Sequence, residues 1–242
     1  MAELSPMMKQ YFETKKKYPD TILMFRLGDF YEMFFDDAVT ASRELELVLT
    51  GRACGQEERA PMCGVPFHSA DSYMARLVAK GYKVAICEQM EDPALAKGLV
   101  KREVVRVLTP GTVIENSMLN EGRNNFLASV YFTGESAGVC FIDVSTGSVN
   151  LTELAAPALP DKIINEIGRF MPSEIVFNSA SSSLTKVFSF ISNKTEALAQ
   201  ELGDNYFDPQ SSAEIILRHF KKDSLSELEL NETGATVPAP GA

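Results

Sequence analysis

Alternating apolar and polar residues near the start of the chain predict two short strands joined by a tight turn. An apolar run over residues 22–25 is followed by Gly28 and Asp29, a pair typical of chain reversals, and then by the letters FYEMF. Successive side chains of a strand point to opposite faces. The second strand therefore presents two sets of residues, one on each face: Phe30, Glu32 and Phe34, and Tyr31, Met33 and Phe35.

Glu32 is the residue of this strand that burial alone does not explain. A carboxylate placed between two phenylalanines on a buried face is unfavourable unless it is paired. An exposed aromatic ring can wedge between stacked bases, and a neighbouring carboxyl group can hydrogen-bond a base edge that has lost its pairing. The residues leave open the alternative that Phe30 and Phe34 are core residues and Glu32 is a solvated or salt-bridged strand residue.

The remainder of the first half predicts a mixed α/β domain. Ser5 and Pro6 are typical of a helix start, and Gly81 is typical of a helix end. Apolar periodicity predicts helices over residues 5–17, 36–46 and 69–80. It predicts strands or extended segments over residues 47–50, 61–66, 82–87 and 103–108, with a turn-rich connection over residues 88–98.

The second half begins with strands and continues with alternating helices and strands. An antiparallel meander is predicted over residues 126–132, 137–144 and 148–154. A helix over 159–170, strands over 174–177 and 187–191, and helices over 195–202 and 211–220 follow. We therefore expect two α/β domains, residues 1–110 and 126–222, joined by a linker over 111–125 that is rich in Pro, Gly, Asn and Ser. Residues 223–242 contain few apolar residues and are predicted to be a tail or the truncated start of another domain.

Composition restricts the class of protein. The 242 residues carry a net charge of −10, but residues 1–110 hold 15 basic and 16 acidic residues, so the acidity belongs to the second half, at 8 against 17. No run approaches the roughly 18 apolar residues of a membrane span, and no secretory signal is visible. The four cysteines lack CxxC spacing, which predicts reduced thiols, a cytoplasmic protein and no metal site.

Several stretches in order resemble the amino-terminal part of the MutS family of bacterial DNA mismatch-repair proteins. They are PMMKQYFETKKKYPD, ILMFRLGDFYEMFFDDA, LTGR, PMCGVPFHS, the run from AICEQ to LTPGT, and DVSTGSVNLTEL. The resemblance implies a mixed-sheet mismatch-recognition domain followed by an RNase H-like connector domain. It implies that Phe30 stacks at a mispaired base and that Glu32 hydrogen-bonds that base, either as an acceptor or after taking up a proton.

The same resemblance implies further contacts and partners. Six residues match regions of the family that contact the DNA backbone: Asp29, Arg52, His68, Ser69, Lys101 and Arg102. Double-stranded DNA with mismatches or small loops is the implied ligand, MutL is the implied partner of the connector domain, and a nucleoid-associated homodimer is implied for the full-length protein. The family's ATP and Mg site would lie beyond this chain, which has no GxxxxGK[ST] motif, so we expect a non-enzymatic fragment without a cofactor.

Two other functions fit some of the residues. A nuclease would use acidic residues as metal ligands, and the candidates are Asp29, Glu32, Asp36, Asp37 and Asp143. A protein-interaction module would use the acidic second half as a partner surface, and this role is compatible with DNA binding by the first half.

Overall fold

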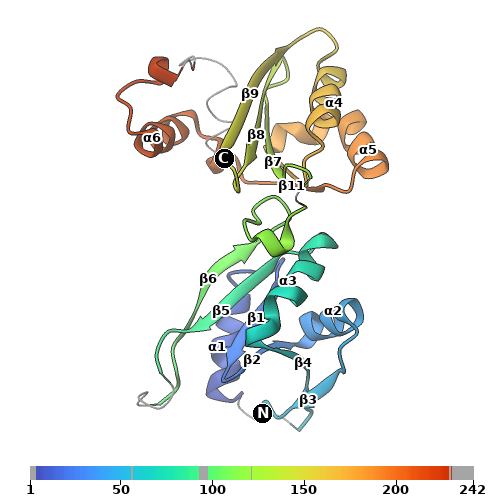
Figure 1. The fold of residues 1–242 in the computed structure, drawn as a ribbon, viewed down its shortest axis with the longest axis vertical. Coiled ribbons are helices and arrows are strands. Elements are labelled where there is room, and N and C mark those ends of the chain that lie inside the picture. Colours follow the sequence, from blue (N-terminus) through green and yellow to red (C-terminus); the bar gives the residue numbers. More distant parts are fainter. Residues whose placement is uncertain (1–3, 56, 93–97, 121, 229, 231–242) are drawn as a thin grey trace. The chain divides into compact units, whose positions relative to one another are not determined.

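The computed structural model describes residues 4–55, 57–92, 98–120, 122–228 and 230. The chain divides into two compact units, residues 1–109 and residues 110–242 (Figure 1). Each unit is a mixed α/β structure built on its own sheet. Within the described residues, no helix combines the length and the apolar content needed to cross a bilayer.

The first unit contains three helices and six strands among its described residues. The helices are α1 (Pro6–Lys15), α2 (Phe35–Leu45) and α3 (Ala70–Ala79), the last preceded by a 3-10 turn over Phe67–Ser69. The strands are β1 (Ile22–Leu27), β2 (Phe30–Phe34), β3 (Thr50–Arg52), β4 (Ala60–Pro66), β5 (Val84–Gln89) and β6 (Arg102–Leu108). The predicted opening helix is confirmed, because Ser5 accepts a hydrogen bond from the Met8 amide at 3.4 Å and Pro6 is its first residue.

The sheet of the first unit has the order β3-β4-β2-β1-β5-β6. Strands β1 and β5 are parallel, and the other neighbours are antiparallel. Helix α1 covers one face, where Tyr11 packs edge-on against Phe25 and Phe34. Helix α2 lies on the opposite face, where the Cys63 thiol donates to the Ala38 carbonyl. Strand β2 is thus central, and only part of its length lies beneath α1.

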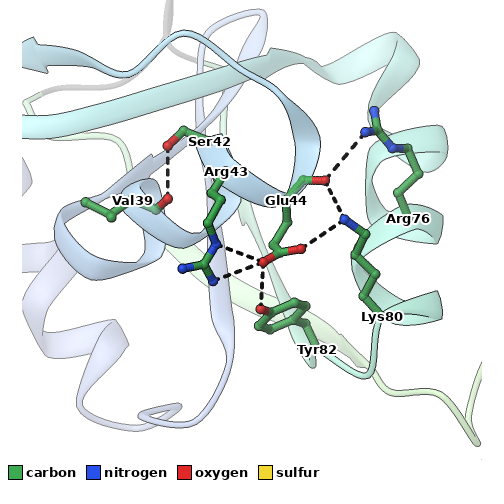
Figure 2. A network of polar contacts seen from close by, with 7 residues as sticks. All are labelled: Val39, Ser42, Arg43, Glu44, Arg76, Lys80 and Tyr82. Atoms are coloured by element: carbon green, nitrogen blue, oxygen red, sulfur yellow. Dashed lines mark hydrogen bonds and ion pairs between the residues drawn. The ribbon is translucent and has the colours of Figure 1, made fainter. Parts of the chain in front are cut away.

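Helices α2 and α3 are tied together by a polar network around Glu44 (Figure 2). The Glu44 carboxylate accepts from Lys80 Nζ at 2.9 Å, from Tyr82 Oη at 3.2 Å and from Arg43 Nε at 3.0 Å. Its main-chain carbonyl accepts from Lys80 and from Arg76. These contacts hold the carboxyl end of α2 against the last turn of α3.

The second unit contains a five-stranded sheet with the order β11-β10-β7-β8-β9. Its strands are β7 (Phe126–Phe132), β8 (Ser136–Asp143), β9 (Ser148–Ala155), β10 (Glu174–Phe177) and β11 (Leu198–Glu201). Its helices are α4 (Leu159–Phe170), α5 (Thr185–Lys194) and α6 (Pro209–Phe220), with 3-10 turns over Asn116–Met118, Ser179–Ser183, Asp204–Phe207 and Leu225–Leu228.

The predicted meander is confirmed, since β7, β8 and β9 pair in antiparallel order. Strands β10 and β11 then add in parallel on the other side of β7. A core of Phe126, Phe141, Ile163 and Val187, among others, joins the sheet to α4 and α5. An antiparallel meander extended by parallel strands agrees with the RNase H-like fold expected of this unit.

Two predicted elements of the second unit are wrong. Residues 187–191 were expected as a strand but belong to helix α5, because Val187 and Ile191 are four residues apart and are buried on one helical face. Residues 195–202 were expected as a helix but contain strand β11, which pairs with β10 from Leu198 to Glu201. Sheet pairing here outweighs the helix propensity of Leu, Ala, Gln and Glu.

Three smaller expectations also change. The strand predicted over residues 47–50 begins only at Thr50, and Val48 before it is 80% exposed. Phe35 was expected on the face opposite Phe34, but it opens helix α2 with φ +53° and packs on Phe12 of α1, so it turns toward the Phe34 side. Among the described residues after Lys222, Leu225 is buried against Ile216, so this part of the predicted tail is packed. Part of the connection over 88–98, and residues 231–242, lie outside the described residues.

Candidate nucleic-acid interface

A two-residue turn of Gly28 and Asp29 joins β1 to β2 and carries Phe30 at its exit. Leu27 and Phe30 are paired across the two strands, and Gly28 has φ +58°, a conformation that glycine adopts without strain. The Gly28 amide donates to Gln89 Oε1 at 2.8 Å, and the Asp29 carbonyl accepts from the Phe67 amide at 2.9 Å. The turn is therefore held from both sides, by β5 and by the segment after β4.

Phe30 and Phe34 occupy opposite ends of one face of β2. Phe34 is fully buried beneath Tyr11, whereas Phe30 is 47% exposed and lies beside Pro66 of β4. The alternation predicted from the sequence is confirmed for Phe30, Glu32 and Phe34. The structure therefore presents an aromatic ring at a fixed turn, with a carboxylate two positions further along the same face.

Glu32 is not a lone carboxylate. Its Oε2 forms an ion pair with Nη1 of Arg52 on β3, and the side chains of Glu32 and Arg52 are 13% and 38% exposed. Gly64 of the intervening strand β4 is the register partner of Glu32, and a Cβ built there would lie 3.5 Å from Glu32 Cγ. Because Gly64 has no side chain, it leaves the space beside the Glu32 side chain open.

Arg102 lies on the same face but is directed inward. Its guanidinium donates to the Arg26 carbonyl at 2.7 Å, to the Val100 carbonyl at 2.9 Å and to Gln10 Oε1 at 3.0 Å. It also lies 5.2 Å from the ring centroid of Phe25, the cross-strand partner of Glu32. Burial lowers the pKa of Arg102, and the nearby positive charge of Arg52 acts in the same direction. Arg102 is thus a half-buried cation that is already hydrogen-bonded within the unit.

The other sequence-derived candidates are more exposed. Asp29 and His68 are exposed, and Ser69 precedes α3, donating from Oγ to the Pro66 carbonyl at 3.3 Å. Lys101 is exposed and pairs with Glu103 at 2.7 Å, a hydrogen bond that raises the pKa of the lysine. Asp29 lies in the turn before Phe30, and His68 follows Phe67, whose amide bonds the Asp29 carbonyl, whereas Lys101 immediately precedes β6.

Sequence reasoning missed Arg26 and Phe67, which lie next to the turn. The Arg26 guanidinium lies 3.7 Å from the ring centroid of Phe67 and 5.4 Å from that of Tyr31, and it pairs with Glu88 at 3.6 Å. Phe67 is 42% exposed. No local pattern reveals this stack, because its members come from β1, β2, β5 and the turn after β4.

Three of the carboxylates considered for a nuclease, Glu32, Asp37 and Asp143, have other partners. Asp37 is buried and bonds the Leu23 amide at 3.0 Å and Lys15 Nζ at 2.9 Å. Burial opposes ionisation of Asp143, but hydrogen bonds from the Ser145 hydroxyl and from the amides of Asn125, Ser145 and Thr146 lower its pKa. No group of three or more metal-binding side chains converges anywhere in the described part of the chain.

Comparisons with known proteins agree with this architecture. A family model described as MutS domain I matches residues 5–117, and one described as MutS domain II matches residues 125–242. DNA mismatch repair protein MutS of Ruminiclostridium cellulolyticum is 50% identical over 241 residues, which cover 98% of this chain and 28% of that protein. The MutS proteins of Lachnoclostridium phytofermentans and Clostridioides difficile are each 49% identical, covering 100% and 97% of this chain but 26% and 24% of theirs.

The two units, their order and their sheets define a two-domain α/β protein of the DNA mismatch-repair class. The chain belongs to the MutS family, and its first unit matches the family's domain I. It spans about a quarter of the length of the curated relatives it matches.

Proposed function

We propose that the first unit recognises mispaired or unpaired bases in duplex DNA by inserting the Phe30 ring and hydrogen-bonding the displaced base with Glu32. One observation carries the proposal: Phe30 is 47% exposed at a turn that is hydrogen-bonded on both sides, with Glu32 on the same face. A wedge must project from a rigid support, because a mobile ring would lose its rotational freedom on insertion.

The selectivity follows from the mechanical weakness of a mismatch. Separating stacked bases with an apolar wedge costs a few kcal/mol, and it costs least where pairing is already disturbed. A ring that enters any base step with equal geometry therefore enters a mismatch most readily. Recognition of this kind reads deformability and does not need a separate contact for each mispair.

Glu32 adds a test of the base itself. A correctly paired base has its Watson–Crick edge occupied, whereas a mispaired base can offer a donor to a carboxylate. Against a matched duplex the carboxylate finds no free Watson–Crick donor, and its charge is repelled by the phosphates, so it opposes binding. Glu32 thus increases the difference in affinity between the mismatched and the matched duplex.

Asp29, His68, Ser69 and Lys101 are proposed as contacts to the adjoining DNA backbone, with Lys101 supplying positive charge.

The test compares binding of two duplexes that differ only at one position, which is either paired or mismatched. Fluorescence anisotropy at low salt gives both dissociation constants for the 242-residue chain. The same measurement is made on a chimaera in which this chain replaces the matching amino-terminal quarter of the R. cellulolyticum MutS protein. Phe30→Ala is expected to weaken mismatch binding by about tenfold to a hundredfold, the usual range for one base–aromatic stack, and to change homoduplex binding little.

Three further variants sharpen the result. Phe30→Leu keeps apolar bulk without a planar ring and is expected to restore only part of the preference. Glu32→Ala is expected to raise homoduplex affinity relative to mismatch affinity, because a repelling charge is removed. Val39→Ala removes an apolar residue of similar exposure on α2 and is the control. An unchanged mismatch-to-homoduplex ratio in both Phe30→Ala and Glu32→Ala would rule out the proposal.

For the second unit we propose docking of a repair partner, MutL in this family. Val144 and Val149 are about half exposed beside the β8–β9 turn, and β9 is an edge strand of an acidic unit. Exposed apolar residues at a sheet edge suit a protein partner better than DNA. Val149→Asp should abolish capture of purified MutL if this edge is the contact, and Ile215→Asp on α6 is the matched control.

In the full-length protein we propose a nucleoid-associated homodimer that binds ATP and Mg elsewhere in its chain.

A further inference from the structure

We propose that Arg52 is a positioning residue for Glu32, and that it orients the carboxylate and offsets its charge while the carboxylate contacts a mispaired base. This inference rests on the proposed function of Phe30 and Glu32. It assigns Arg52 a role different from the DNA-backbone contact expected from the sequence, because the guanidinium is engaged by Glu32.

The geometry allows Glu32 to bind Arg52 and a base together. The ion pair uses Oε2 of the carboxylate and Nη1 of the guanidinium. A carboxylate offers two oxygens with about four acceptor positions, so the pair leaves capacity for a hydrogen bond from a base. Glu32 is the more buried member and Arg52 the more exposed one, at 13% and 38%. The arginine therefore fixes the carboxylate from the β3 side of the sheet, while Phe30 lies two residues away along β2.

The charges around the pair favour this arrangement. Arg102 is half-buried on the same face and is held by Arg26, Val100 and Gln10. Its positive charge repels Arg52, and this repulsion adds to burial in lowering the pKa of Arg102. Glu32 is the anionic partner of Arg52 in the structure. A paired carboxylate approaches a polyanion with less repulsion than an unpaired one, so the pair permits contact with DNA.

The electrostatic surroundings of Glu32 come from three strands. Asp29, in the turn that precedes β2, is an exposed acid three residues before Glu32 in the sequence. Arg52 approaches from β3, and Arg102 approaches from β6 near Phe25. Gly64 of β4 adds no charge. Two cations of different burial thus lie on the Glu32 face, and only Arg52 forms an ion pair with it among the described residues.

A double-mutant cycle tests the assignment in the two proteins described above, with Arg52→Met, Glu32→Gln and the double variant. Arg52→Met is expected to lower the mismatch-to-homoduplex ratio by about fivefold, the fold-change that corresponds to a coupling of about 1 kcal/mol. In the Glu32→Gln background the same change should have little effect, because a neutral amide needs no counter-charge. Arg52→Lys keeps the charge without the planar fork and should give an intermediate ratio.

A direct phosphate contact by Arg52 predicts the opposite pattern. Arg52→Met would then weaken both duplexes equally, in both backgrounds, and would reduce the slope of log affinity against log salt by about one. That result would overturn the inference. Arg59→Met, which removes an exposed arginine beside Gly51, is the matched control for charge loss. Circular dichroism checks that each variant is folded. If Arg52→Met does not fold, the comparison is made with Arg52→Lys.

The two proposals fail in different ways. If Phe30→Ala keeps its mismatch preference, the proposed function is wrong and the Arg52 inference is wrong with it. If Phe30→Ala loses the preference but Arg52→Met changes the two duplexes equally, only the Arg52 inference is wrong.

Discussion

The two ends of strand β2 use the same kinds of residue for different purposes. At the end near α2, Phe34 is fully buried and Asp37 accepts hydrogen bonds from Lys15, Leu23 and Tyr11. At the turn end, Phe30 is 47% exposed and Glu32 has Arg52 as its ion-pair partner. An aromatic ring and a carboxylate are present in both places, and only their surroundings differ.

The difference arises from the coverage by helix α1. Tyr11 packs edge-on over Phe34 with ring centroids 5.1 Å apart, and over Phe25 at 5.6 Å. Lys15 reaches Asp37 from the last turn of the same helix. The turn end of β2 is covered less completely, and there the ring and the carboxylate remain accessible. We infer that stability is concentrated at the covered end and binding at the turn end, and variants of the two phenylalanines and of the carboxylates test this separation.

The largest expected effect is on the two phenylalanines. Phe34→Ala should lower the free energy of unfolding by about 3–5 kcal/mol, as expected for a buried phenylalanine that leaves a cavity. Phe30→Ala should change it by about 0.5 kcal/mol or less, because half of the ring is already in water. Urea unfolding followed by circular dichroism gives both values. Equal losses of stability would show that the two ends do not differ.

Removing the carboxylates should also lower the free energy of unfolding more at the α2 end of β2 than at the turn end, with smaller losses than for the phenylalanines. Asp37→Ala removes the ion pair with Lys15 and the hydrogen bonds from Tyr11 and Leu23 at a buried position, so we expect a loss of about 3 kcal/mol. Asp36→Ala changes the exposed neighbour in the same helical turn and should have little effect. Glu32→Ala should cost less than about 1 kcal/mol, since Arg52 is partly solvated. A Glu32 loss as large as that of Asp37 would contradict the separation.

Two tyrosines extend the comparison to alkaline pH. Burial, reinforced by Asp37, raises the pKa of Tyr11 above its ordinary value of 10.0, and burial with the Glu88 hydrogen bond does the same for Tyr31. The unfolded chain releases these protons first, so stability is full below pH 10 and falls as the pH rises above it. Tyr11→Phe should make this fall shallower, and adding Tyr31→Phe should make it shallower again. Stability curves between pH 8 and pH 12 that are parallel for all variants would contradict this prediction.

The smallest effect is expected away from β2, in the Glu44 network of Figure 2. Hydrogen bonds from Lys80 and Arg43 lower the pKa of Glu44 to about 2. Because the folded pKa is depressed, the contribution is present above the unfolded value near 4.5 and is lost as the pH falls toward about 2. Glu44→Gln should therefore reduce stability slightly at neutral pH. It should also make the decrease in stability with falling pH shallower below about 4.5. A difference that persists unchanged at pH 2 would argue against this cause.

Several elements could be predicted from the sequence alone because their signals are local. Helix α4 and strands β7 and β10 have the bounds that periodicity predicts, and Ser5 caps α1 as expected. Strand β11 and helix α5 could not be assigned in this way. Their segments are short, and pairing with β10 in one case and burial of Val187 and Ile191 in the other decided the outcome.

The features of the candidate site also fall into those that the sequence predicts and those that it does not. The turn at Gly28 and the shared face of Phe30, Glu32 and Phe34 follow from a glycine and a period of two, which any strand obeys. The exposure of one ring, the burial of the other and the pairing of Glu32 with Arg52 do not. Those depend on where α1 ends and on which strand lies two places away in the sheet. The sequence by itself determined which residues share a face, and the tertiary structure alone decided which of them meet solvent and which meet a partner, because burial and ion pairing depend on neighbours that are distant along the chain.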